Sequence, residues 1–130
     1  MGWWNRRVRG RQRVPPEQPR LDIRLALSPR GCLRGFTAEG HAGAAAAGNN
    51  LACAAATSLM RTAGRLCAER GLVVSGESSA PGSMRMALGA GADGEAAWLR
   101  GVTDFLLRGL NDLAREFPRE ILVRMETTEV

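Results

Sequence analysis

The sequence predicts an α+β domain, a two-layer sandwich in which a mixed sheet of about five strands packs against two helices. Two observations predict this fold. Apolar and polar residues alternate in several short segments, and two longer segments repeat apolar residues at three- and four-residue steps. The order along the chain is strand, strand, helix, strand, strand, helix, strand, which is typical of an α+β fold.

The first two strands are expected to form a hairpin. Residues 21–27 alternate leucine or isoleucine with smaller or charged residues, the period-two pattern of a strand with one buried face. The next four residues, 28–31, read Ser-Pro-Arg-Gly, and proline in the second place with glycine in the fourth suits a type I turn. Residues 32–40 should therefore return as the second strand.

The first helix is predicted over residues 51–70 and should end near Gly71. Its apolar residues at helical spacing, expected to face the core, are Leu51, Ala55, Leu59, Ala63 and Leu66. Its charged residues, expected on the outer face, are Arg61, Arg65 and Glu69.

The second half of the chain should supply three strands and one helix. A third strand opens at residues 72–74, a turn follows at 80–82, and residues 83–88 form the fourth strand. After a glycine-rich break, residues 95–117 have helical periodicity until Pro118 stops them, and a last strand begins at Ile121. The predicted core residues of this second helix are Trp98, Leu99, Val102, Leu106, Leu110, Leu113 and Phe117.

The net charge is concentrated at the N-terminus. Of 130 residues, 1–20 carry six arginines and one acid and so hold the whole net charge of +5, whereas 21–130 are neutral. We expect residues 1–20 to be a disordered basic arm and 21–130 to be one domain. A neutral body argues against a nucleic-acid-binding domain, so such contact is expected only through the arm.

No targeting signal is apparent in the arm. Arg6-Arg7 resembles part of a twin-arginine signal, but no apolar segment of seven or more residues follows it. No segment approaches the length of a membrane span. A cytoplasmic protein without membrane contact is therefore expected.

Three cysteines and one histidine limit the chemistry. In a cytoplasmic protein Cys32, Cys53 and Cys67 should be reduced thiols. Cys53 and Cys67 would lie about 21 Å apart on one helix, and Cys32 and His41 about 30 Å apart on one strand, so no metal site or other cofactor is expected. Only His41 and Cys53 can meet, because a glycine-containing loop connects them.

Such a pair has the chemistry of a thiol hydrolase. Cys53 should lie in the opening turn of the first helix, where free N–H groups and the helix dipole stabilise a thiolate. An imidazole beside it can act as general base and then as general acid. The N–H groups at Cys53 and Ala54, with loop amides near Gly48, can stabilise an oxyanion. The alternative is that Cys53 is a small core residue and His41 only ends a strand.

This segment resembles the signature of the ribosomal-processing cysteine protease family, Prp. The family has a Gly-His pair, a glycine-containing loop, and then Gly-x-Asp-Ile-x-Cys-Ala-Ala-x-Ser. The matching residues are Gly40, His41, Gly48, Cys53, Ala54 and Ala55, with Leu51 in the place of isoleucine. The resemblance extends over 21–130 in element order and includes Phe117-Pro118.

The resemblance implies a cytoplasmic endopeptidase with His41 as general base and Cys53 as nucleophile. Such enzymes remove a short N-terminal extension from a bacterial large-subunit ribosomal protein during ribosome assembly. The family also implies a homodimer and a loop that orders over the substrate, here containing Gly43 and Gly48.

Two departures from the family pattern concern supporting residues. Asn50 stands in the place of the aspartate and can orient His41 through its amide or serve only as a helix cap. Thr57 stands in the place of the serine; this replacement keeps the hydroxyl and adds a methyl group. The alternative function is a catalytically weak or silent relative that acts as a ribosome-associated binding module.

Overall fold

The computed structural model describes residues 20–40, 51–80 and 83–129. Its elements follow the predicted order of strands and helices. They are β1 (Leu21–Leu27), β2 (Leu33–Glu39), α2 (Leu51–Glu69), β3 (Val73–Ala80), β4 (Ser83–Leu88), the 3₁₀ helix η1 (Ala90–Glu95), α3 (Ala96–Glu116) and β5 (Ile121–Thr127). The predicted disordered arm lies outside the described residues, except for Arg20.

The strands form one mixed five-stranded sheet in the order β3-β4-β2-β1-β5. β5 is parallel to β1, and the other neighbours are antiparallel. The predicted turn closes the first hairpin, because the Gly31 N–H donates to the Ser28 carbonyl oxygen at 2.8 Å. Gly31 has φ +83°, a backbone conformation that glycine adopts without strain. The α+β fold with a mixed sheet is confirmed.

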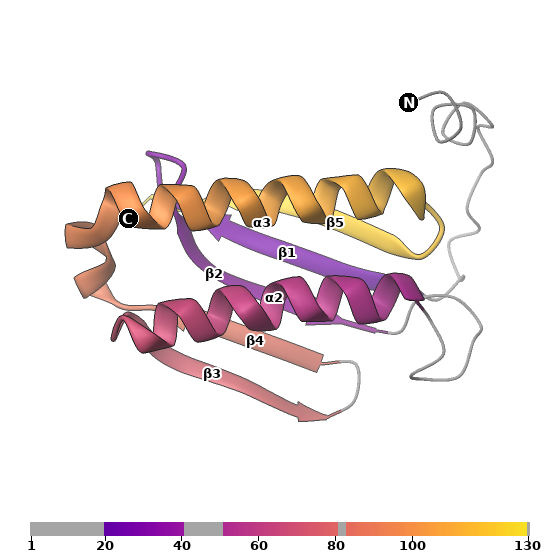
Figure 1. Ribbon diagram of the computed structural model, residues 1–130, viewed down its shortest axis with the longest axis horizontal. Coiled ribbons are helices and arrows are strands. Elements are labelled where there is room, and N and C mark those ends of the chain that lie inside the picture. The colour runs from indigo at the N-terminus through magenta and orange to yellow at the C-terminus, as the bar shows by residue number, and fades with distance from the viewer. Residues whose placement is uncertain (1–19, 41–50, 81–82, 130) are drawn as a thin grey trace.

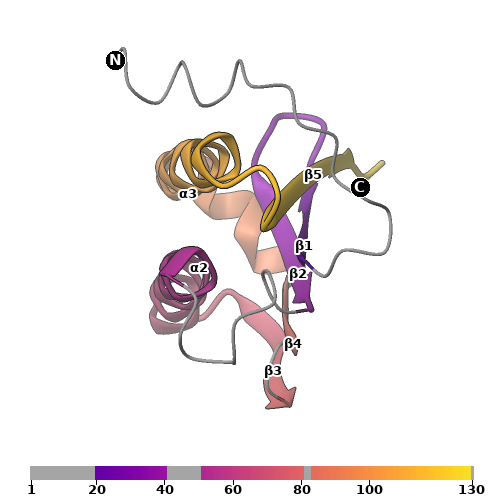
Figure 2. The same ribbon diagram turned by 90° about the vertical axis from the view of Figure 1, so that its right-hand side faces the viewer.

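Both helices cover the same face of the sheet and lie side by side on it (Figure 1; Figure 2). Along β1 the side chains of Leu21, Ile23 and Leu25 are buried against this helix layer, as their alternation predicted. Asp22 and Arg24 alternate with them and therefore lie on the opposite face. No helix of the described residues covers that face (Figure 2).

The buried face of α2 differs from the predicted one. The residues that pack on the core are Ala52, Ala56, Met60, Ala63 and Cys67. Of the leucines predicted there, Leu51 is 78% exposed and Leu66 is 42% exposed. The helix is turned by about one residue, or 100°, and Leu59 lies beside Gly109 of α3 instead of on the sheet. The outer face with Arg61 and Arg65 is as predicted.

α3 has its predicted periodicity, but its core face also contains a polar residue. Leu99, Thr103, Leu106 and Leu110 are buried, while Val102 and the other predicted core positions are half-buried. The Thr103 hydroxyl donates to the Leu99 carbonyl oxygen at 2.7 Å and accepts the Leu33 N–H at 2.9 Å. It therefore ties α3 to the start of β2.

The segment before α3 differs from its predicted form, and the segment after α3 agrees with the prediction. The glycine-rich segment before it, expected as an irregular break, forms η1. After it, the N–H groups of Glu120 and Ile121 both donate to the Phe117 carbonyl oxygen at 3.0 Å. This tight turn around Pro118 leads directly into β5, as predicted.

Candidate active site

Cys53 occupies the position that the sequence predicted, in the opening turn of α2. It is the third residue of the helix and is half-buried against the hydrophobic core. The first turn of α2 contains no acidic residue that would oppose a negative charge on sulfur. The first turn of an α-helix carries N–H groups without helical acceptors and the positive end of the helix dipole.

Two neighbours of Cys53 on α2, Ala54 and Thr57, are among the predicted supporting residues. Thr57 follows one turn later, shares a face with Cys53 and is half-buried. Ala54 is exposed. The remaining predicted site residues, His41, Gly43, Gly48 and Asn50, lie outside the described residues.

The described ends of the segment that contains these residues lie at one end of the molecule. Gly40 follows β2, and Leu51 begins α2; both are at the end where β1 starts (Figure 1). Gly40 has φ +101°, and a Cβ there would lie 2.5 Å from the Arg20 carbonyl oxygen. The glycine of the Gly-His pair is thus required by both conformation and space.

The other two thiols belong to the core. Cys32 is buried, and its Sγ lies 3.6 Å from the Ala96 carbonyl oxygen. Cys67 is fully buried, and this burial raises the pKa of its thiol because desolvation penalises the thiolate. Neither thiol is placed to act as a nucleophile, and this agrees with the sequence interpretation.

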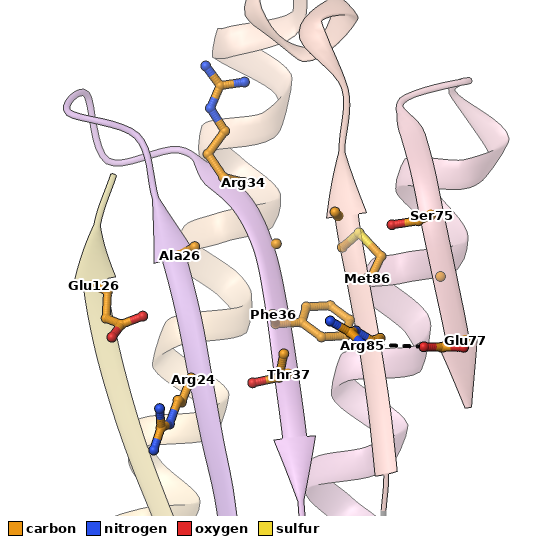
Figure 3. A pocket seen from close by; sticks show the side chains of 13 residues that line it. Arg24, Ala26, Arg34, Phe36, Thr37, Ser75, Glu77, Arg85, Met86 and Glu126 are labelled. Atoms are coloured by element: carbon orange, nitrogen blue, oxygen red, sulfur yellow. Dashed lines mark hydrogen bonds and ion pairs between the residues drawn. The ribbon is translucent and has the colours of Figure 1, made fainter. Parts of the chain in front are cut away.

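The uncovered face of the sheet contains a trough of about 720 Å³ (Figure 3). Small side chains form one cross-strand row of its floor, with Glu126 at the end of the row. The row is Glu126, Ala26, Gly35, Ala87 and Ser75. Arg85 and Glu77, two residues further along their strands, form an ion pair of 3.5 Å, so the charges are mixed. This face lies opposite α2 and therefore away from Cys53.

Neither a metal centre nor a membrane helix is found in the described part of the chain. Over residues 20–40, 51–80 and 83–129 no group of three or more histidine, cysteine or acidic residues could hold a metal ion. Within the same residues no helix has both the length and the apolar character needed to cross a membrane.

Known structures share this fold. The crystal structure of SMU.848 from Streptococcus mutans superposes with a TM-score of 0.67 at 20% identity, covering 84% of this chain and 96% of that one. The Staphylococcus aureus ribosomal processing protease Prp with a covalently linked product peptide gives 0.65 at 14% identity, covering 83% and 99%. The same protease with a substrate peptide gives 0.62 at 12% identity, again covering 83% and 99%. No curated protein sequence matches the chain significantly.

The sequence profile of the family described as cysteine protease Prp matches residues 21–122. The match contains the whole of β1 to α3, and with them Cys53 and the segment between β2 and α2. Since it covers well over half of the chain, the protein belongs to the cysteine protease Prp family.

Proposed function

We propose that this protein is a cysteine endopeptidase that removes the N-terminal extension of a bacterial large-subunit ribosomal protein. The observation that carries the proposal is the position of Cys53 in the opening turn of α2, within the segment that the family profile matches. The chain's single histidine, His41, directly follows Gly40 in the sequence, and Gly40 lies at the end of the molecule where α2 begins. A thiol and an imidazole can therefore act together there.

The proposed reaction begins with transfer of the Cys53 thiol proton to His41. The thiolate attacks the scissile carbonyl carbon, and the N–H groups of Cys53 and Ala54, with loop amides near Gly48, stabilise the oxyanion. His41 then protonates the leaving amine as the C–N bond breaks, which leaves a thioester on Cys53. Water deprotonated by His41 attacks the thioester, releases the carboxylic acid product and restores the thiol.

Supporting roles are proposed for Asn50 and Thr57. Asn50 would orient the His41 ring through its side-chain amide, as in Cys-His-Asn arrangements, or it would serve only as the N-cap of α2. The Thr57 hydroxyl, on the same face as Cys53, would bond to the Cys53 carbonyl or orient a site group. Gly43 and Gly48 would let the loop between them close over a bound peptide.

The biological setting is proposed from the family. A Staphylococcus aureus relative of the same fold is described as a ribosomal processing protease and was crystallised with substrate and product peptides. By analogy this chain would act in the cytoplasm during ribosome biogenesis, on a ribosomal protein precursor, and as a homodimer.

Cleavage of a ribosomal protein precursor with its N-terminal extension tests the function. The wild type should release the extension, and Cys53→Ala should not. Cys32→Ala, which removes a thiol outside the site, should retain cleavage. Equal cleavage by Cys53→Ala would refute the role of that thiol, and failure of a folded wild type would favour the ribosome-associated binding module instead.

A further inference from the structure

The outer side of the helix layer contains an apolar groove between α2 and α3, with a volume of about 360 Å³. Leu59 and Leu66 line it from α2, and Trp98, Val102 and Phe105 line it from α3. Phe105 is 70% exposed and Leu66 is 42% exposed. Such large apolar side chains gathered at one hollow indicate an interaction surface rather than scattered surface residues.

The groove is preformed by small residues and a fixed aromatic ring. Its lining also includes Ala63 and Gly101, and a Cβ added at Gly101 would meet no atom within 4 Å. The Trp98 ring is held by the Arg70 guanidinium, which lies 4.3 Å from the ring centroid. Arg70 is in turn fixed by Glu95 at 2.9 Å. The hollow is therefore wide enough for a bulky side chain and has one wall already in place.

The groove is separate from the candidate active site. Leu59 is six residues from Cys53, which on an α-helix places it about 120° around the axis. Leu59 faces α3, where a Cβ at Gly109 would lie 2.8 Å from its Cδ1. A ligand in the groove would thus leave Cys53 uncovered.

The chain itself contains a segment with suitable anchors and sufficient length. Two of its three tryptophans, Trp3 and Trp4, lie outside the described residues, in the basic arm. The arm joins the domain at Leu21, whose N–H donates to the Glu120 carbonyl oxygen at 2.9 Å. Leu21 is therefore close to the C-terminal end of α3, which is Glu116.

The distances allow the arm to reach the groove. Phe105 and Trp98 lie about 17 and 27 Å back along α3 from Glu116, at 1.5 Å per residue. The sixteen peptide steps from Arg20 back to Trp4 span up to about 53 Å when extended. The arm is long enough to cross the end of the helix layer and follow it to Trp98.

We propose that Trp3 and Trp4 dock in the groove between α2 and α3, so that the arm forms a strap over the helix layer. The indole rings would cover Phe105 and Leu66, and aromatic contacts with Trp98 would orient them. None of the described residues that line the groove is charged, so the groove offers the arginines of the arm no ion pair. Docking should therefore depend on apolar burial and change little with salt.

Tryptophan fluorescence of the full chain tests this proposal. The signal of Trp3 and Trp4 is the difference between the emission of the wild type and that of a chain with Trp3→Ala and Trp4→Ala, and the reference is a free peptide of residues 1–20. We expect blue-shifted emission and several-fold slower acrylamide quenching than in the peptide, unchanged by added salt. Adding Phe105→Asp should return both values to those of the peptide. The matched control is Val74→Asp, at a 67% exposed apolar site on β3, and it should have no effect.

The same experiment distinguishes the proposed strap from other occupants of the groove and from docking elsewhere. A difference emission like that of the free peptide, in a wild type with native helix content, would overturn the proposal. So would a blue shift that survives Phe105→Asp, because the arm would then dock elsewhere. A blue shift that disappears on dilution would assign the groove to a second copy of the chain, and this too would overturn the strap.

Discussion

Thr103 makes a specific prediction about what joins the helix layer to the sheet. Its hydroxyl is fully buried and accepts the Leu33 N–H at 2.9 Å. Thr103→Val keeps the shape of the side chain but removes the acceptor. An unsatisfied buried N–H costs about 1–3 kcal/mol, and the added methyl group returns at most about 0.8 kcal/mol. We expect a loss of roughly 1–2 kcal/mol in the free energy of unfolding.

Thr103→Ser is the matched variant, because it keeps both hydrogen bonds and loses only a methyl group. Its cost should be about 1 kcal/mol, from lost burial and a small cavity. Since the expected losses in the free energy of unfolding overlap for the two variants, the deciding quantity is the rate of hydrogen exchange of the Leu33 amide. That amide should remain protected in Thr103→Ser and exchange much faster in Thr103→Val.

Urea unfolding followed by circular dichroism, together with amide exchange read by NMR, makes both measurements. At this chain length a loss of 1–2 kcal/mol lowers the melting temperature by about 4–8 °C. The reasoning fails if Thr103→Val is as stable as the wild type and the Leu33 amide stays protected. That result would mean that another acceptor serves the Leu33 N–H.

Three further predictions concern the site and the packing of the helices. Asn50→Asp should raise the cleavage rate if residue 50 orients His41, because a carboxylate also stabilises the imidazolium; an unchanged rate would make Asn50 a helix cap only, since aspartate caps equally well. Because burial raises the pKa of Cys67 above its ordinary 9.0, the folded state holds that proton more tightly. Its contribution to stability is complete below pH 9.0 and is lost as the pH rises through the folded pKa, so alkaline urea titrations should show a loss that Cys67→Ala abolishes. Gly109→Ala should leave the free energy of unfolding almost unchanged, because the gain of about 1 kcal/mol in helix propensity is offset by displacement of the Leu59 side chain. In a Leu59→Ala chain the same substitution should be stabilising. Equal effects in the two chains would contradict the contact between Leu59 and Gly109.

The parts of the fold that sequence patterns predicted well depend on local chemistry. The alternation of residues 21–27 and the turn at Ser28–Gly31 specify the first hairpin without reference to the rest of the chain. Likewise the position of Cys53 in the first turn of α2 follows from where the helical periodicity begins.

The buried face of α2 could not be predicted in this way. Both the stripe that contains Leu59 and the stripe that contains Met60 have helical spacing, so periodicity alone does not choose between them. The choice depends on a contact fifty residues away, where Gly109 leaves room for Leu59 beside α3. The buried role of Thr103 is hidden for the same reason, since its partner Leu33 is seventy residues away.

A candidate site could be proposed from the sequence because two rare residue types are involved. One histidine and a thiol at the start of a helix restrict the chemistry to a single pair, whereas the groove between α2 and α3 left no such signal. Phe105 lies off the main apolar stripe of α3, so the sequence alone suggests an isolated surface residue. Only the structure shows that Leu66 lines the same groove.

Alkylation of Cys53 against pH tests most directly whether His41 activates that thiol. Iodoacetamide labelling, with peptide mapping to separate Cys53 from the buried Cys32 and Cys67, is compared in wild type, His41→Ala and the urea-unfolded chain. Near neutral pH, wild-type Cys53 should react several times faster than in the unfolded chain, and His41→Ala should lose most of this advantage. A Cys53 rate that equals the unfolded one, unchanged by His41→Ala, would contradict the catalytic pair.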